Sequence, residues 1–162
     1  MRVAILCAAL WLAACEGKAP GEALMKEVIG RDVGTVVVQT LDGEATPLND
    51  PLRDTTKPTL VNIWATWCTP CLTEMPSLDA LGRSGRANVI AIATDASATV
   101  VKEFLRNQNW GRGITVLHDP NGTVTREAFN AKALPTSVAL DASLTITYAI
   151  AGPREWEDWQ PE

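Results

Sequence analysis

The sequence contains no run of basic residues. Its 14 lysines and arginines are outnumbered by 19 aspartates and glutamates, which leaves a formal net charge of −5, so nucleic acid is not expected as a partner. Internal repeats and low-complexity tracts are also absent, and an apolar content of 46% is typical of a packed domain rather than a disordered chain. The 162 residues suit one domain with a full core, not two.

Cysteine and histidine are scarce. The four cysteines are Cys7, Cys15, Cys68 and Cys71, and His118 is the single histidine. We expect His118 to be an ordinary loop residue. Together with Cys68 and Cys71 it could still complete a three-ligand metal site, so a metal-handling function stays open as an alternative.

The N-terminal segment lacks the length of a membrane span. Arg2 precedes an apolar stretch from Val3 to Ala14. This stretch is shorter than the roughly 20 residues needed to cross a bilayer and is typical of the core of a secretory signal. It ends in Leu12-Ala13-Ala14-Cys15 and resembles a bacterial lipoprotein signal, which implies cleavage before Cys15 and lipidation of that cysteine. An ordinary cleavage site and an uncleaved anchor are the alternatives.

The lipoprotein interpretation decides which thiols remain. Cys7 leaves with the signal and Cys15 carries the lipid, so only Cys68 and Cys71 are left. An exported protein with one adjacent pair of thiols is expected to use that pair for chemistry, a structural disulfide being the alternative.

The predicted organisation is a signal peptide at residues 1–14, a tether at residues 15–34 and one folded domain at residues 35–162.

The motif Trp67-Cys68-Thr69-Pro70-Cys71 directly follows the apolar run Leu60–Ala65. Two thiols separated by two residues can close a small disulfide ring or open to a dithiol with little backbone movement. A strand that delivers them to the first turn of a helix stabilises the leading thiolate, because a helix N-terminus carries partial positive charge. Pro70 suits such a turn. The motif therefore predicts a redox centre.

The order of apolar patterns predicts an α/β fold. Expected strands lie at 36–41, 46–52, 60–65, 89–93, 114–117, 138–140 and 144–151. Expected helices lie at 71–82, 95–108 and 125–132, with a last helix starting at Pro153. Asp42-Gly43 favours a tight hairpin between the first two strands. This order gives a mixed central sheet with helices on both faces and an N-terminal β-hairpin, which is the thioredoxin-like sandwich.

The segment from Val61 to Pro76, VNIWATWCTPCLTEMP, closely resembles the TlpA-like branch (ResA- and CcmG-type) of the thioredoxin superfamily. Further matches are Asp42-Gly43, Asp119-Pro120-Asn121-Gly122, Leu134-Pro135-Thr136 and Gly152-Pro153. The resemblance covers about residues 35 to 159. It implies a membrane-anchored, extracytoplasmic thiol–disulfide oxidoreductase of the kind that serves cytochrome c maturation.

The motif and the resemblance together assign roles around the cysteines. Cys68, exposed at the helix start beside Trp67, is the expected nucleophile, and a buried Cys71 is the resolving thiol. Glu74 lies on or near the same helix face as Cys71 and resembles the family's active-site glutamate, which could exchange a proton with the thiols; a solvated surface carboxylate is the alternative. Asn62 stands where thioredoxins proper have a buried aspartate, and an amide cannot take a proton.

The segment Leu134-Pro135-Thr136 resembles the family's cis-proline loop. The resemblance implies that Pro135 is cis and faces the cysteines, that the backbone beside it pairs with an extended substrate, and that Leu134 borders the docking surface. Ten residues follow Gly152, where the family has a longer closing helix. Either one sheet edge is less covered, or Trp156 and Trp159 cover it alone.

The expected function is reduction of disulfides in protein substrates on the periplasmic side of the cell envelope. The redox-active disulfide Cys68–Cys71 is the only cofactor implied, no metal is expected, and a membrane electron donor of the CcdA/DsbD type would recharge the pair. Thr69-Pro70 offers no charge to a thiolate and ionised Glu74 would oppose one, so we expect a reductant.

Two alternative functions remain open. A copper-binding chaperone of the same superfamily has three residues between its cysteines and adds a specific histidine. A thiol peroxidase needs a threonine and an arginine around a single peroxidatic cysteine, and the sequence around Cys68 does not follow that pattern.

Overall fold

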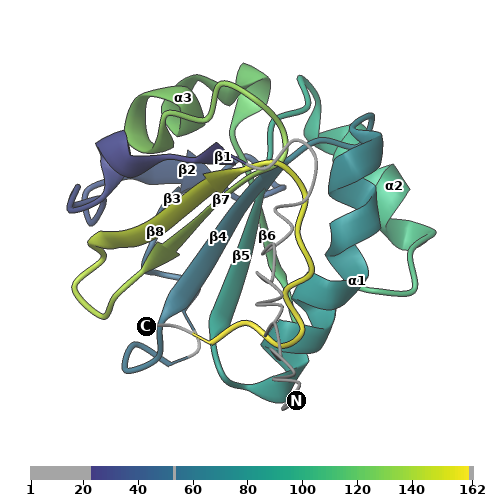
Figure 1. The fold of residues 1–162 in the computed structure, drawn as a ribbon. Coiled ribbons are helices and arrows are strands. Elements are labelled where there is room, and N and C mark those ends of the chain that lie inside the picture. Colours follow the sequence, from purple (N-terminus) through teal and green to yellow (C-terminus); the bar gives the residue numbers. More distant parts are fainter. Residues whose placement is uncertain (1–22, 53, 161–162) are drawn as a thin grey trace, which may run out of the picture.

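The computed structural model describes residues 23–52 and 54–160 (Figure 1). The predicted signal peptide and the predicted lipidation site, Cys15, lie outside the described residues. Within the described part, no helix has the length and apolar character needed to cross a bilayer.

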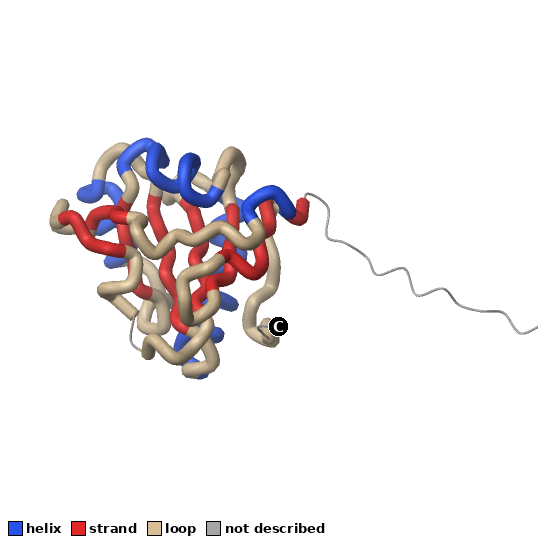
Figure 2. Tube along the Cα trace, turned by 90° about the vertical axis from the view of Figure 1, so that its left-hand side faces the viewer, coloured by secondary structure: helices blue, strands red, loops and turns tan. Residues whose placement is uncertain are grey.

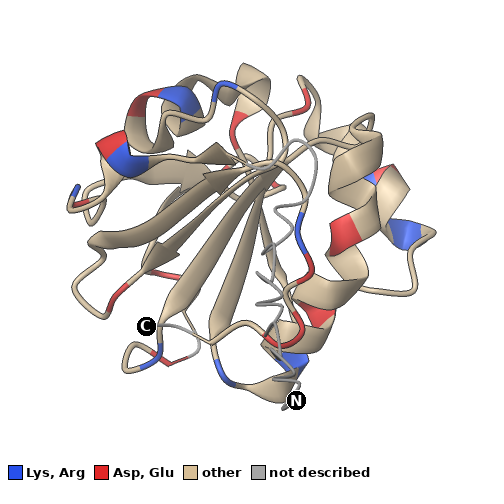
Figure 3. Ribbon diagram, in the orientation of Figure 1, with Lys and Arg blue, Asp and Glu red and all other residues tan. Residues whose placement is uncertain are grey.

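One eight-stranded sheet organises the chain, in the order β1-β8-β7-β4-β5-β6-β2-β3. The strands are β1 (Ala23–Leu24), β2 (Val37–Gln39), β3 (Ala45–Pro47), β4 (Thr59–Trp64), β5 (Asn88–Ala93), β6 (Thr115–His118), β7 (Thr136–Leu140) and β8 (Ile146–Ala151). The helices are α1 (Thr69–Ser84), α2 (Ala98–Arg106) and α3 (Thr123–Phe129), with short 3₁₀ turns η1 (Lys26–Val28) and η2 (Pro120–Gly122). None of these strands contains Lys, Arg, Asp or Glu, so the charged residues lie on helices and loops (Figure 3).

The sheet is mixed, as predicted. β4 runs parallel to β5, and β5 runs parallel to β6, whereas β7 lies antiparallel to both β4 and β8. β2 and β3 form the predicted N-terminal hairpin around Asp42-Gly43, and Gln39 joins this hairpin to β6 opposite His118. Because β4 and β5 are apolar on both faces, they take the centre of the sheet.

Helices cover both faces of the sheet, α1 and α2 on one and α3 on the other (Figure 1). Alternate residues of β4 belong to different apolar clusters, since successive side chains of a strand point to opposite faces. Leu60 and Trp64 pack with residues of α1 and α2, while Val61 and Ile63 pack with Phe129 of α3. The thioredoxin-like sandwich is therefore confirmed.

The folded part begins earlier than the predicted boundary at residue 35. Met25, Val28 and Val33 are buried in the apolar cluster under α3, and β1 pairs with β8 at the sheet edge. Figure 2 shows this first strand and helical turn seated beside the rest of the domain. By its sequence the segment from Ala23 to Ile29 could make a short helical turn, but its apolar positions are too few to predict one. The edge pairing supplies the backbone hydrogen bonds that fix the segment.

The predicted helix starting at Pro153 is not formed. The chain after β8 runs without a helix along α1 (yellow in Figure 1). Its backbone N–H groups find side-chain acceptors on α1 instead: Arg154 N donates to Glu74 Oε2, and Trp156 N donates to Ser77 Oγ. These bonds replace the bonds that a helix would have given.

Candidate active site

Cys68 and Cys71 form a disulfide at the start of α1, with their Cα atoms 5.3 Å apart. Cys68 is the residue that caps the helix, and Pro70 lies in its first turn. The backbone N–H of Cys71 donates to Cys68 Sγ at 3.3 Å. The positive end of the helix therefore points at this sulfur, which is the arrangement that stabilises a thiolate after reduction.

The two sulfurs are both largely enclosed. Cys71 is fully buried, as expected, but Cys68 is only 5% exposed, whereas an exposed side chain was predicted. The difference arises because the turn before α1 is tight, with Cys68 N donating to Ala65 O at 3.1 Å, and because the sulfur packs in the same apolar cluster as Trp64. Trp67 is 71% exposed, so its side chain lies largely in solvent beside the motif.

The accessible edge of Cys68 borders a groove of about 800 Å³. The walls of the groove come from the motif, from the loop after β5, from the start of α3 and from the loop before β7. Leu134, which the resemblance places beside the docking surface, lines this groove. Arg126 and Lys132 add two cationic side chains, and Arg126 also donates from Nη1 to Asn121 O at 2.6 Å. The groove is therefore the candidate route by which a protein segment reaches Cys68.

The peptide bond between Leu134 and Pro135 is cis, as the resemblance predicted. Two hydrogen bonds hold this loop: Gly152 N donates to Pro135 O at 2.9 Å, and Thr136 Oγ1 donates to Ala133 O at 2.7 Å. Thr136 also pairs with Ile63 near the end of β4. The loop is thereby fixed at the end of the sheet from which the cysteine motif emerges.

Glu74 is a buried carboxylate, 1% exposed, and not a solvated residue of the helix surface. Its Oε1 accepts from Asn62 Nδ2 at 2.7 Å, and its Oε2 accepts from Trp156 Nε1 and from Arg154 N, each at 3.0 Å. Burial raises the pKa of Glu74 from 4.5 to about 7, although all three donors lower it by stabilising the anion. The group is therefore poised to gain or lose a proton near neutral pH.

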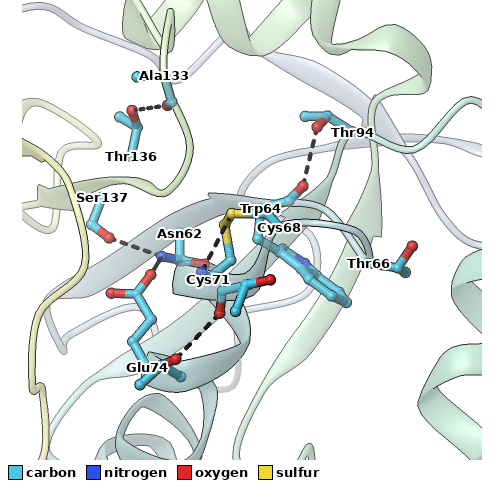
Figure 4. Close-up of a disulfide and its surroundings, with 12 residues drawn as sticks. Asn62, Trp64, Thr66, Cys68, Cys71, Glu74, Thr94, Ala133, Thr136 and Ser137 are labelled. Carbon is cyan, nitrogen blue, oxygen red and sulfur yellow. Dashed lines mark hydrogen bonds between the residues drawn. A yellow bond between two sulfur atoms is a disulfide. The ribbon is translucent and has the colours of Figure 1, made fainter.

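Asn62 connects this carboxylate to the sheet. Its Nδ2 donates both to Glu74 Oε1 and to Ser137 Oγ of β7, the latter at 2.9 Å (Figure 4). The remaining oxygen, Oδ1, is buried and has no hydrogen-bond partner among the described residues. The amide cannot accept a proton from a thiol, but it holds the Glu74 carboxylate in place.

His118 is a buried residue at the end of β6, not the ordinary loop residue that was expected. Its Nε2 lies 2.7 Å from Asp95 O. The Asp95 carboxylate in turn accepts from Thr66 Oγ1 at 2.6 Å and from Thr66 N, so this chain of contacts supports the loop just before the cysteines. Within residues 23–52 and 54–160, no group of three or more histidine, cysteine or acidic side chains is arranged to hold a metal ion.

A model of the AhpC/TSA family matches residues 29–149. The chain belongs to this family. Among similar proteins, the thiol-disulfide oxidoreductase ResA of Bacillus cereus is 28% identical, over 94% of this chain and 86% of the relative. The thiol:disulfide interchange protein DsbE homolog of Paracoccus denitrificans is 31% identical, over 85% of this chain and 74% of the relative.

A solved structure of similar fold is a secreted Mycobacterium tuberculosis disulfide oxidoreductase, described as homologous to E. coli DsbE. It superimposes with a TM-score of 0.57 at 25% identity, covering 70% of this chain and 81% of the other. The likeness to ResA- and DsbE-type proteins that the motif predicted is thus confirmed within the AhpC/TSA family.

Four groups around the Cys68–Cys71 motif escaped sequence reasoning: Asp95, Ser137, the backbone amide of Arg154 and the indole of Trp156. Trp156 and Glu74 are 82 residues apart, and no local pattern links residues at such a distance. Coverage of a sheet edge by Trp156 and Trp159 was one of two alternatives. In the structure Trp156 is hydrogen-bonded to Glu74 and Ser77 of α1. The hydrogen bond to Glu74 had no signal in the sequence.

Proposed function

We propose that this protein is a thiol–disulfide oxidoreductase that reduces disulfides in protein substrates. The observation that carries the proposal is the Cys68–Cys71 pair, set at the N-terminus of α1 with the edge of Cys68 open to a groove. The names of the relatives support the same chemistry. No other cofactor is needed, because the two thiols carry the two electrons.

Reduction of a substrate proceeds in two exchanges. The Cys68 thiolate attacks one sulfur of the substrate disulfide, so that bond breaks, a mixed disulfide forms and a substrate thiolate leaves. The Cys71 thiol then loses its proton, and its thiolate attacks Cys68 Sγ. The mixed disulfide breaks, the second substrate thiolate leaves and takes up a proton, and the enzyme ends as the Cys68–Cys71 disulfide.

Glu74 is the proposed acceptor of the Cys71 proton. The two residues are three apart on α1, which places them on neighbouring positions of one helix face, and both are buried. With a pKa of about 7, the carboxylate is present in both protonation states near neutral pH. Asn62 serves the site by holding the carboxylate, and Leu134, next to the cis-bonded Pro135, lines the groove.

The test is capture of partners on variants of the two cysteines. Cys71→Ala should accumulate mixed disulfides on Cys68, because the nucleophile survives and the resolving attack is missing. Cys68→Ala should accumulate few or none. Non-reducing gels after expression with candidate substrates give the result, and equal trapping by both variants would overturn the assignment.

The protein is further proposed to work outside the cytoplasmic membrane, on the periplasmic side, anchored by lipid on Cys15 after removal of residues 1–14. Support comes from the sequence Leu12-Ala13-Ala14-Cys15. A reductant in that compartment needs recharging, so a membrane donor of the CcdA/DsbD type is the proposed partner. Replacing Cys15 by serine should move the protein to the soluble fraction. A Cys15→Ser protein that stays fully with the membrane would show that an uncleaved anchor holds it.

A further inference from the structure

The segment after β8, Gly152–Gln160, contacts the active-site helix through hydrogen bonds to buried groups. Arg154 N and Trp156 Nε1 both donate to Glu74 Oε2 at 3.0 Å. Trp156 N donates to Ser77 Oγ at 3.1 Å. Ser77 lies three residues after Glu74, so the segment follows one face of α1. Two of the three donors to the Glu74 carboxylate therefore come from this C-terminal segment.

The segment is held in place along its length. Its start is fixed by the bond from Gly152 N to Pro135 O. Trp156 is fully buried in the same apolar cluster as Cys71, and its ring meets that of Trp159 edge-on, with centroids 6.1 Å apart. Further along, Arg86 donates to the backbone oxygens of Glu157 and Trp159. A donor held this firmly can fix the position of its acceptor.

We propose that Trp156 is a positioning residue for the redox step: its indole N–H, with the Arg154 amide, holds Glu74 on the face of α1 that carries Cys71. This inference rests on the proposed function, in which Glu74 takes the Cys71 proton. A carboxylate can do so only as an anion, and an anion that is cut off from water needs donors to replace the hydration it has lost.

The charges around Glu74 are few. From the sheet it meets the neutral side chain of Asn62, which is bonded in turn to neutral Ser137. From the C-terminal segment it meets Trp156 and the Arg154 amide, while Glu155 raises the pKa of Glu74 by charge repulsion.

The Arg154 guanidinium turns toward Tyr148 and the Trp156 ring. Among the hydrogen bonds that lower the pKa of Glu74, that of Trp156 is the largest. Loss of the indole N–H should therefore raise that pKa.

The experiment measures the resolving step alone, as release of glutathione from a mixed disulfide on Cys68 at a series of pH values. Trp156→Phe keeps a buried ring and removes the N–H. Its rate should rise with pH as in the wild type, but with the midpoint shifted upward by about one pH unit, since a hydrogen bond to a charged group is lost. Below the midpoint the rate should fall by up to about tenfold.

Two controls separate this inference from the function on which it rests. Trp159→Phe keeps an aromatic ring beside Trp156 and leaves the bond from Trp156 to Glu74, so its profile should match the wild type. In a Glu74→Gln background, Trp156→Phe should cause no further shift. An unshifted Trp156→Phe profile would overturn the positioning role, while trapping on Cys68 would still support the function. A shift that persists without Glu74 would also overturn the role.

A measurement on the wild type covers the case in which Trp156→Phe does not fold. The indole N–H resonance of Trp156 should titrate with the same midpoint as the Glu74 carboxyl carbon, because the donor responds to the charge of its acceptor. An indole resonance that stays constant while Glu74 titrates would contradict the proposal.

Discussion

The two sulfurs of the disulfide lie in different surroundings. Cys68 borders a groove whose walls include the exposed Trp67 and the cationic Lys132. Cys71 is fully enclosed, and its side of the helix carries the buried carboxylate of Glu74. The same three-residue spacing thus places Cys68 at the wall of the groove and Cys71 in the interior, on the helix face that carries Glu74. The proposed division into nucleophile and resolving thiol rests on this difference.

The largest expected effect concerns the enclosed side of the site, which holds Cys71 and Glu74. Glu74→Gln keeps the size of the side chain but removes the proton acceptor, so resolution of the mixed disulfide should slow by about 100-fold near neutral pH. The rise of the rate with pH through about 7 should also disappear. Stopped-flow release of glutathione gives both quantities.

Glu103→Gln is a matched control, because Glu103 is an exposed carboxylate on α2. Its rate and its pH profile should equal those of the wild type. If Glu74→Gln resolves the mixed disulfide as fast as Glu103→Gln does, Glu74 is not the proton acceptor that distinguishes the surroundings of Cys71 from those of Cys68.

The buried Glu74 carboxylate should also make the stability of the protein depend on pH. The folded pKa of Glu74 lies above its ordinary value of 4.5, so the folded state binds this proton more tightly than the unfolded state. The stability gained is complete below about pH 4.5 and is lost as the pH rises through about 7, a change of at most about 3 kcal/mol.

Urea unfolding of the oxidised protein across this range measures the change. The free energy of unfolding of the wild type should fall more steeply with pH than that of Glu74→Gln. Parallel curves for the two proteins would show that Glu74 titrates at its ordinary value in the folded state.

The smallest expected effect concerns the open side of the site, where Cys68 borders the groove. Lys132→Gln removes one cationic side chain from the groove. Reduction of an acidic disulfide peptide should slow by about two- to threefold at low salt, and the difference should vanish at high salt. Lys57→Gln, which lies outside the groove next to Asp54, is the control. A salt-independent loss would assign Lys132 to packing rather than to attraction of the substrate.

Local patterns in the sequence predicted most of the open side of the site. The spacing of Cys68 and Cys71 and the apolar runs of β4 and β5 are carried by adjacent residues, and the resemblance gave the cis bond before Pro135. Even here the burial of Cys68 was missed, because it depends on how a turn packs against Trp64.

The enclosed side could not be predicted to the same degree. Glu74 looked like a possible surface residue because its partner Trp156 lies 82 residues away. The segment that carries Trp156 was expected to be helical, and its actual path depends on acceptors on α1. Likewise, residues 23–34 join the domain through edge pairing with β8, which no local pattern reveals. Contacts between distant segments decided each of these features.

The direction of electron flow is the central claim, and one potential tests it. Thr69 and Pro70 place no charge between the cysteines. The helix N-terminus favours the Cys68 thiolate, and the buried carboxylate of Glu74 opposes it when ionised. Equilibration of the purified protein with glutathione should therefore give a potential nearer to that of thioredoxin, about −270 mV, than to that of DsbA, about −120 mV. A potential above about −180 mV, the value of protein disulfide isomerase, would make the protein an oxidant or isomerase and contradict the account.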